Sequence, residues 1–234
     1  AGGVRSGTAG TAAAPAAGSR TAPPRRCWIR RPMSRTDDLG IARIHPLVSP
    51  AVVAEELPLP DATADHVDRS RAAVRAVLHG SDPRWLAIVG PCSIHDPDAG
   101  LEYAHRLAEL ADELRDRVLV LMRVYFEKPR TVVGWKGLIH DPDLDGSHRI
   151  NEGLRLARRF LLAVNALGVP AATEFLDTTF GQFYADLIAW AAIGARTTES
   201  QIHRQLASGL SMPVGFKNRT DGDVQVAVDA VRAA

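Results

Sequence analysis

Short apolar runs alternate with longer amphipathic stretches along most of this chain. The runs have the length of buried strands and cover residues 84–90, 118–126, 169–176, 192–196 and 212–218. Between them, apolar residues recur at spacings of three and four, which predicts helices. These cover residues 61–80, 96–117, 150–167, 199–209 and 221–233, with another helix through Phe183, Leu187 and Trp190. Uninterrupted apolar strands that alternate with helices predict a parallel sheet covered by helices.

Two parallel architectures fit this alternation, an open doubly wound sheet and a closed eight-stranded barrel. Polar residues favour the barrel, because Arg123, Glu174, Arg196 and Lys217 stand at or near the ends of separate strands. In a barrel such ends meet at one site, whereas an open sheet uses only a few adjacent strands. We therefore predict an α/β fold of the (β/α)8 TIM-barrel type, truncated after about five strands because closure needs eight.

Two segments precede the barrel pattern. Residues 1–32 contain six Arg and no acidic residue, are rich in Ala, Gly and Pro, and lack an apolar period. Such a segment cannot offset its ordering entropy. We predict a disordered extension, either translated ahead of a true start at Met33 or acting as a transit peptide. Residues 33–80 are predicted to form an N-terminal arm and helix, and residues 81–234 the partial barrel.

Overall composition narrows the functional classes. The chain has 28 Lys and Arg against 27 Asp and Glu, so no overall field attracts it to nucleic acid. It contains no apolar run of about 18 residues, so no membrane span is expected. Its two cysteines, Cys27 and Cys92, do not make a disulfide framework for a chain of this size, which is typical of a cytoplasmic protein.

Cations gather where the predicted strands end. This group comprises Arg123, Lys128, Arg130, Arg196, Lys217 and Arg219. A single Arg or Lys is usually a solvated surface charge. At the mouth of a sheet, however, burying such a charge is costly without a counter-charge. Several such cations predict an anionic ligand with more than one negative group, because Arg suits phosphate and carboxylate. Phosphorylated sugar acids and phosphoenolpyruvate fit this description.

Other reactive side chains stand beside these cations. Cys92, in GPCSIHD, is either a small buried hydrophobe, a thiolate ligand of a divalent metal or a nucleophile, and His95 adds only a weak metal signal. Glu174 is expected to pair with one of the cations. In GARTTESQ, Thr197 or Thr198 is predicted to cap a helix whose first turn contains Glu199.

Long motifs now identify a family. The strings GPCSIHD, MRVYFEKPRT, GWKG, GARTTESQ and GFKN, together with TDDL near the start, resemble the class I 3-deoxy-7-phosphoheptulonate (DAHP) synthases. The resemblance runs from about Met33 to Thr220 with motif order intact. It implies a metal-dependent transferase of the shikimate pathway, which leads to chorismate and the aromatic amino acids. Such an enzyme condenses phosphoenolpyruvate with D-erythrose 4-phosphate to give 3-deoxy-D-arabino-heptulosonate 7-phosphate and phosphate.

The resemblance also implies roles for individual residues. Phosphoenolpyruvate would be held by Arg123, Lys128, Arg196, Lys217, Glu174 and the backbone N–H of Ala195, with Arg123 and Lys128 catalytic. Erythrose 4-phosphate would be bound by Pro129, Arg130 and Thr131. Cys92 would be one ligand of a divalent metal cation (Mn, Fe, Co or Zn) that polarises the aldehyde.

Regulation and assembly follow from the same resemblance. Asp37, Asp38, Asp177 and Ser211 match the pocket for an aromatic amino-acid inhibitor, and the N-terminal arm would help to build a homo-oligomer. Gly181 replaces the proline expected in the phenylalanine-sensitive type, which leaves tyrosine equally open as the effector.

The remaining metal ligands of the family and a further phosphate-binding Arg have no counterpart here, so we expect this chain alone to be inactive. An alternative hypothesis is a non-catalytic remnant that binds phosphorylated ligands or an aromatic amino acid. A relative making an eight-carbon sugar acid is disfavoured by TDDL, KPRT and GWKG.

Overall fold

The structure of the protein is a computed structural model that describes residue 36 and residues 38–234. Contacts divide the chain into two units, residues 1–46 and residues 47–234. In the first unit, Asp38 has a φ of 60° and its carbonyl accepts a hydrogen bond from the Ile41 N–H, which closes a turn. Residues 1–32 and Asp37 lie outside the described residues, so the predictions made for them stay predictions.

A five-stranded parallel sheet forms the centre of the second unit. Its strands are β1 (Trp85–Val89), β2 (Val118–Arg123), β3 (Ala171–Glu174), β4 (Trp190–Ile193) and β5 (Val214–Phe216). They pair in chain order, β1-β2-β3-β4-β5, without the switch in order that an open doubly wound sheet requires. The prediction of a barrel-type α/β fold is confirmed, with five strands forming a half-barrel.

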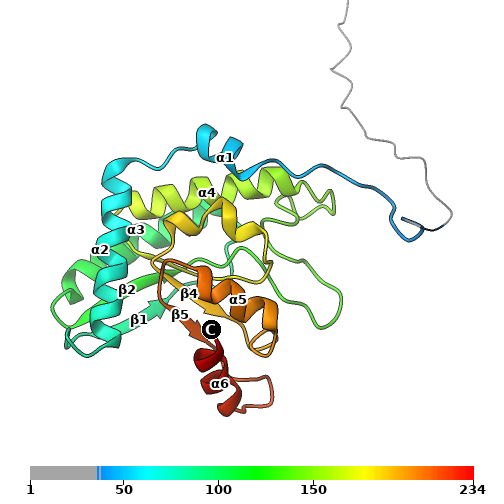
Figure 1. Ribbon diagram of the computed structural model, residues 1–234. Helices are drawn as coiled ribbons and strands as arrows, with labels where there is room; N and C mark the ends of the chain where they lie inside the picture. Colours follow the sequence, from blue (N-terminus) through cyan, green and yellow to red (C-terminus); the bar gives the residue numbers. More distant parts are fainter. Residues whose placement is uncertain (1–35, 37) are drawn as a thin grey trace, which may run out of the picture. The chain divides into compact units, whose positions relative to one another are not determined.

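Helices connect the strands and precede the sheet. They are α1 (Pro50–Glu56), α2 (Asp61–Leu78), α3 (Pro97–Leu114), α4 (Ile150–Ala166), α5 (Gln201–Gly209) and α6 (Gln225–Ala233). Parallel crossovers are right-handed, so strands in unbroken chain order place successive helices on the same face. Figure 1 shows the helices arranged around the sheet, and α3 packs on both β2 and α4. None of the described helices is long and apolar enough to cross a membrane.

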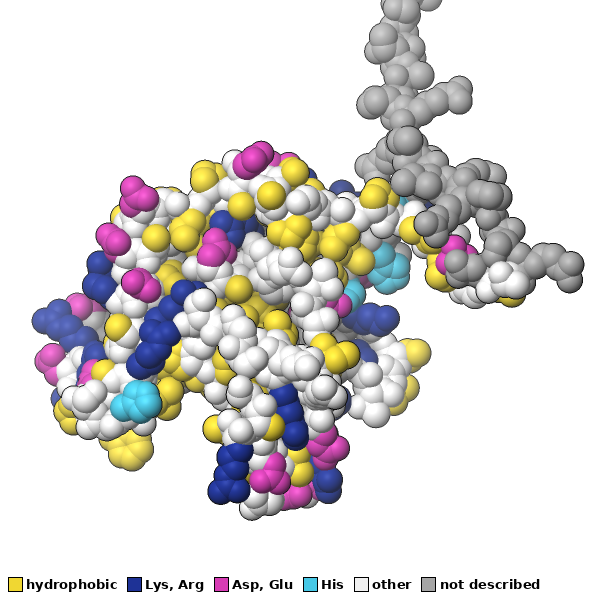
Figure 2. Space-filling view, in the orientation of Figure 1, with side chains coloured by type: hydrophobic (Ala, Val, Ile, Leu, Met, Phe, Trp, Pro, Cys, Tyr) yellow, Lys and Arg dark blue, Asp and Glu magenta, His cyan; other side chains and the backbone are white. Residues whose placement is uncertain are grey.

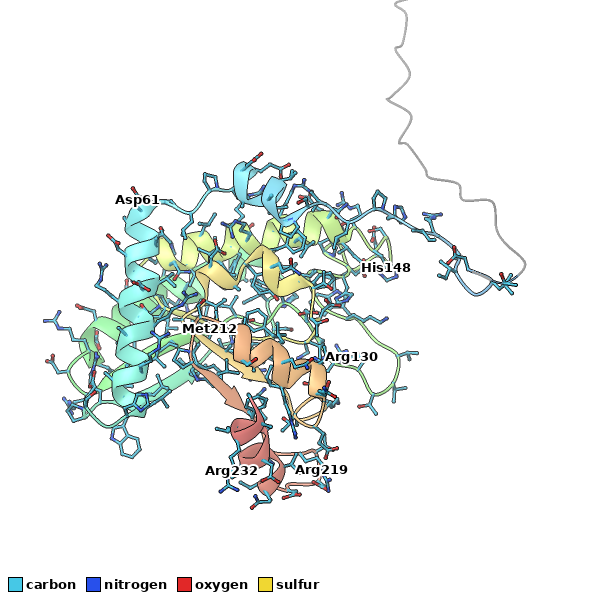
Figure 3. The ribbon with its side chains drawn as sticks, in the orientation of Figure 1. Asp61, Arg130, His148, Met212, Arg219 and Arg232 are labelled. Atoms are coloured by element: carbon cyan, nitrogen blue, oxygen red, sulfur yellow. The ribbon has the colours of Figure 1, made fainter. Side chains whose placement is uncertain are left out.

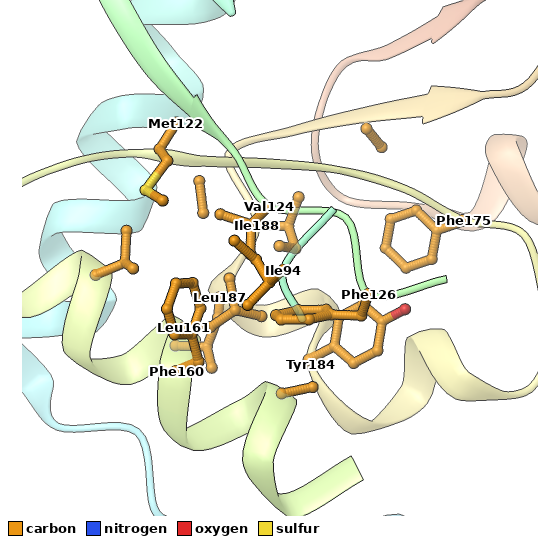
Figure 4. Close-up of a cluster of buried hydrophobic side chains, with 14 of the residues drawn as sticks. Ile94, Met122, Val124, Phe126, Phe160, Leu161, Phe175, Tyr184, Leu187 and Ile188 are labelled. Atoms are coloured by element: carbon orange, nitrogen blue, oxygen red, sulfur yellow. The ribbon is translucent and has the colours of Figure 1, made fainter. Parts of the chain in front are cut away.

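Alternate residues of each strand face two separate hydrophobic clusters. On β2, Val120 and Met122 belong to the large cluster under the helices, whereas Leu121 belongs to a small cluster on the opposite face. The large cluster includes the rings of Phe126 and Phe160, in edge-to-face contact (Figure 4). The two-residue period of a strand therefore separates a helix-facing side from an inner side of the half-barrel.

Two local predictions were wrong. The helix expected through Phe183, Leu187 and Trp190 is two short 3-10 turns, η1 (Phe180–Phe183) and η2 (Ala185–Leu187), and Trp190 is the first residue of β4. The apolar residues there are spaced for a helix, but the strand pairs through Ala191 and Ala192, whose small side chains carry little periodic signal.

The predicted cap of α5 was also wrong. The helix begins at Gln201 after Ser200, and Glu199 lies before it. Thr198 is instead fully buried, and its hydroxyl lies 2.9 Å from the carbonyl oxygen of Gly194 and 2.7 Å from that of Lys217. Thr198 therefore connects the loop after β4 to the end of β5. This contact depends on the pairing of β4 with β5, which local sequence does not show.

Arg158 of α4 holds the η1–η2 segment in place. Its side chain is 3% exposed and forms an ion pair with Asp186 at 2.8 Å. The same guanidinium donates to the carbonyl oxygens of Leu57, at 2.7 Å, and Phe183, at 2.9 Å. One buried side chain thus joins the end of α1 and the 3-10 turns to α4.

We expect Arg158→Ala to lower the free energy of unfolding by about 3 kcal/mol, since it leaves two carbonyl groups without donors and removes the buried guanidinium that pairs with Asp186. Urea unfolding followed by circular dichroism measures this loss. Arg159→Ala, an exposed neighbour on α4, is the matched control and should change stability by less than about 0.5 kcal/mol. Equal effects of the two variants would contradict the anchoring role.

Candidate anion-binding site

The inner side of the half-barrel presents charged residues at its carboxyl rim. Arg123 ends β2, Glu174 ends β3 and Lys217 directly follows β5. Arg123 and Glu174 lie two residues after Leu121 and Ala172, which belong to the inner cluster. Side chains two residues apart on a strand point to the same face, so Arg123 and Glu174 are on the inner side. A Cβ at Gly194 would lie 2.3 Å from the Glu174 carboxylate, so any larger residue here would displace this side chain from its present position.

Lys217 and Glu174 form the ion pair expected from the sequence. The Lys217 Nζ lies 2.8 Å from Glu174 Oε2, and the Glu174 side chain is 9% exposed. Burial by itself lowers the pKa of Lys217, but the hydrogen bond and charge of Glu174 outweigh it, so the pKa is raised. Lys217 therefore stays protonated and is held in place by a neighbour with little solvent access.

Cys92 lies among cations. The Lys128 Nζ is 2.7 Å from its Sγ, and Arg123 Nη2 donates to its backbone carbonyl at 3.1 Å. The hydrogen bond from Lys128, with the charges of Lys128, Arg123 and Arg130, lowers the pKa of the thiol. Of the three interpretations left open for Cys92, the small buried hydrophobe is wrong, because the residue is exposed and its sulfur accepts a hydrogen bond from Lys128.

The loop after β2 carries the residues predicted for the second substrate. Pro129 is partly buried and follows Lys128, while Arg130 and Thr131 are exposed. Arg130 Nε donates to the Trp135 carbonyl at 2.7 Å, which folds the loop on itself. Arg196 Nε donates to the Thr131 hydroxyl at 3.2 Å, so the loop after β4 contacts the loop after β2. Ala195, partly buried, precedes Arg196 in the loop that follows β4.

Positive charge dominates the rim. Arg123, Lys128, Arg130, Arg196 and Lys217 come from three strand ends, and within the described chain only Lys217 among them has an ion pair with a carboxylate. Arg219 does not join this group, because it pairs with Glu199 and Asp221, which raise its pKa. Figure 3 shows Arg219 beside α6. A cluster with four cations lacking a fixed carboxylate partner is suited to an anion with several negative groups.

Two residues at the rim were missed by sequence reasoning. The Tyr125 ring is 6% exposed and lies against two cations, with Arg123 Cζ 4.0 Å and Lys217 Nζ 5.0 Å from the ring centroid. The signal was available, since the two-residue period of β2 continues from Arg123 to Tyr125.

Glu127, the second missed residue, is 4% exposed, and its Oε1 has no hydrogen-bond partner within the described structure. Its Oε2 accepts a long hydrogen bond, 3.4 Å, from the Asp177 N–H. Burial, together with the charges of Asp177 and Glu174, raises the pKa of Glu127 to about 7. The fully buried phenol of Tyr184 faces the same group, and burial raises its pKa as well. Glu127 therefore titrates near neutrality.

Of the metal site expected from the sequence, the described structure contains one predicted ligand, Cys92. Among residue 36 and residues 38–234, no group of three or more His, Cys, Asp or Glu side chains is placed to hold a metal ion. The Cys92 sulfur lies 2.7 Å from the Lys128 ammonium, and in the described chain Cys92 belongs to no such group of potential metal ligands. The described residues therefore do not make up a metal site, and no chemical step is assigned to a metal here.

A cavity lies near the residues predicted to be regulatory. It has a volume of about 370 Å³ and opens between the η1–η2 segment and α5, lined by Thr178, Gly181, Gln182, Ala185, Gln205, Leu206, Gly209 and Leu210. Asp177 and Ser211 directly flank its lining, and Asp177 Oδ1 accepts the N–H groups of Thr179 and Phe180 at the start of η1. In Figure 2 the central part of the viewed face, over α5, is mainly uncharged.

The strands pair in chain order and end at a cationic rim, so the chain is an α/β half-barrel of the TIM-barrel type with a candidate anion-binding site at the carboxyl ends of its strands. A model of the DAHP synthetase I family matches residues 61–234. The chain belongs to this family.

Individual relatives agree with the family assignment. The Trp-sensitive phospho-2-dehydro-3-deoxyheptonate aldolase of Escherichia coli K12 is 62% identical over 202 residues, covering 86% of this chain and 58% of that protein. The Trp-sensitive aldolase of Salmonella typhimurium is 60% identical with the same coverage. A solved phospho-2-dehydro-3-deoxyheptonate aldolase from Francisella tularensis SCHU S4 superposes with a TM-score of 0.82 at 54% identity, covering 83% of this chain and 57% of that one. The chain thus spans a little over half the length of these relatives.

We expect the free energy of unfolding to fall as the pH rises from 5 to 8.5. The folded-state pKa of Glu127, about 7, lies above its ordinary value of 4.5, so its stabilising contribution is full at low pH and is lost on ionisation. Glu127→Gln should remove up to roughly 3 kcal/mol of this fall. Urea unfolding at several pH values tests it, with Glu109→Gln, an exposed carboxylate on α3, as control. Parallel pH curves for wild type and Glu127→Gln would contradict the assignment.

Proposed function

We propose that this protein serves the condensation of phosphoenolpyruvate with D-erythrose 4-phosphate to 3-deoxy-D-arabino-heptulosonate 7-phosphate and phosphate, at the entry to aromatic amino-acid biosynthesis. The observation that carries the proposal is the meeting of Arg123, Lys128, Arg196 and Lys217 at one rim, with a single carboxylate among them. The printed names of the relatives, phospho-2-dehydro-3-deoxyheptonate aldolases, support the same reaction and disfavour a non-catalytic remnant.

The chemistry of the substrates matches this arrangement. Phosphoenolpyruvate carries a phosphate and a carboxylate, and the proposed roles give both groups cationic partners from different strand ends. Its C3 attacks the aldehyde of erythrose 4-phosphate, water adds at C2, and the phosphate then leaves. The cations orient the substrate and offset negative charge as it accumulates. Pro129, Arg130 and Thr131, in the loop that contacts Arg196, are proposed to bind erythrose 4-phosphate.

Several further assignments belong to the proposal. Cys92 would be one ligand of a divalent metal cation (Mn, Fe, Co or Zn), which acts as a Lewis acid when bound. Assembly into a homo-oligomer and a cytoplasmic location are also proposed, the latter because two cysteines in the whole sequence are typical of a reducing compartment.

Phosphoenolpyruvate binding to the chain tests the proposal directly. We expect a measurable dissociation constant by calorimetry, weakened roughly 10- to 100-fold by Arg196→Ala or Lys128→Ala, since a hydrogen bond to a charged group contributes about 1.5–3 kcal/mol. Arg159→Ala, an exposed cation on α4, should bind as the wild type does. An unaltered dissociation constant in both rim variants, or no binding by the wild type, would refute the proposal.

Phosphate release addresses the reaction itself. The chain is mixed with both substrates and Mn²⁺, and phosphate is compared with that from Cys92→Ala. Release above this control would contradict the sequence-based expectation that the chain alone is inactive.

An aromatic amino acid is the proposed effector of the cavity between the η1–η2 segment and α5. The cavity's volume and largely uncharged lining suit an aromatic side chain, and Asp177 beside it can pair with an amino group. The relatives are named Trp-sensitive enzymes, which favours tryptophan as the effector over the phenylalanine and tyrosine considered from the sequence.

Filling the cavity should abolish effector binding without harming the fold. Gly209 lines it, and a Cβ there would meet no atom within 4 Å, so a side chain can leave the backbone at this position without a clash at its first carbon. We expect tryptophan to raise the thermal midpoint of the wild type and of Ser208→Leu, an exposed neighbour, but not of Gly209→Leu. Stabilisation of Gly209→Leu to the wild-type extent would place the effector elsewhere.

A further inference from the structure

The side chain of Tyr125 occupies an unusual position between two residues of like charge. Arg123 ends β2 and Lys217 follows β5, and β3 and β4 separate these strands in the sheet. Both cations nevertheless lie over one aromatic ring, with Arg123 Cζ at 4.0 Å and Lys217 Nζ at 5.0 Å from its centroid. The ring thus spans the inner side of the half-barrel and connects two strand ends that do not pair.

The cations have few other fixed partners. Arg123 Nη2 donates to the Cys92 carbonyl, but its Nε is buried and has no hydrogen-bond partner in the described structure. Lys217 has the Glu174 carboxylate as its ion-pair partner, at 2.8 Å. Hydrogen bonds and ion pairs alone therefore leave Arg123 weakly oriented, and the contact with the ring supplies the missing constraint.

The electronic character of the ring accounts for this contact. An aromatic face carries the negative part of the ring quadrupole and attracts a cation within about 6 Å, more strongly where water is excluded. Tyr125 is 6% exposed, so its ring is shielded from water, although the Lys217 side chain is 38% exposed. Both cations are attracted to the same aromatic ring, and this attraction offsets part of the repulsion between them. A neutral aliphatic side chain of similar size would not attract them.

We propose that Tyr125 is a positioning residue, whose ring holds Arg123 and Lys217 at the spacing that an anion with two charged groups requires. This inference rests on the proposed function, since phosphoenolpyruvate supplies such an anion. Tyr125 acts through the two cations and is not assigned a contact with the reacting atoms.

A graded change in the charge of the ring face tests the proposal while an aromatic ring is kept at position 125. Tyr125→Phe in the full chain removes the hydroxyl, and phenylalanines bearing one, two and three fluorines at position 125 then withdraw charge from the ring face. We expect the dissociation constant of phosphoenolpyruvate, by calorimetry, to rise stepwise and to reach about tenfold above Tyr125→Phe with trifluorophenylalanine. A ring that only fills space would give no such series.

Two controls separate the outcomes. Trifluorophenylalanine at Tyr103, which is 37% exposed on α3, should leave binding unchanged, and thermal midpoints across the series should stay within a few degrees because volume is conserved. If the wild type binds phosphoenolpyruvate and all members of the series bind it with equal affinity, the role of Tyr125 is overturned and the proposed function stays intact. Failure of the wild-type chain to bind phosphoenolpyruvate would overturn both.

Discussion

Parallel pairing of the strands in chain order is the constraint on which the rest of this structure depends. Because β1 to β5 pair successively and in one direction, their carboxyl ends lie along one rim. The two-residue period of each strand then assigns alternate side chains to the helices and to the inner side. Residues that are far apart in sequence, Arg123 and Lys217 among them, become neighbours for this geometric reason alone.

Collecting cations at that rim has an electrostatic cost, and the structure shows how it is offset. Glu174 neutralises Lys217 and overcomes the effect of burial on its pKa. The aromatic face of Tyr125 attracts both Lys217 and Arg123, while the Cys92 carbonyl and thiol accept hydrogen bonds from Arg123 and Lys128. The remaining positive charge is available to an anion, which agrees with the substrates proposed for the family.

The proposed substrate site and the proposed effector cavity are joined through covalent neighbours and one buried carboxylate. Asp177 starts the η1 turn that lines the cavity, and its N–H donates to Glu127, the residue before Lys128. Arg158 fixes the other end of the same segment to α4. A rigidly held segment with a titratable group at its edge is thus placed beside the loop that carries the rim cations.

Most elements of the fold were predictable, because buried strands and amphipathic helices leave apolar patterns that local sequence preserves. The failures have physical causes. Trp190 begins β4 although its spacing from Leu187 suggested a helix, since pairing with β3 and β5 outweighs local periodicity. Thr198 was expected to cap α5, but its hydroxyl is used between two strand ends that only the sheet brings together.

The sequence by itself determined the family, the strand and helix order, and the identity of the cations at the strand ends, because these follow from motifs and from local periodicity. Only the tertiary structure decided which cations share a partner, that Tyr125 lies between two of them, and that Glu127 is buried. Contact between residues of non-adjacent strands and the burial of Glu127 depend on how the strands and loops are assembled in the half-barrel. Burial raises the pKa of Glu127 to about 7, and the neighbouring sequence does not predict this shift.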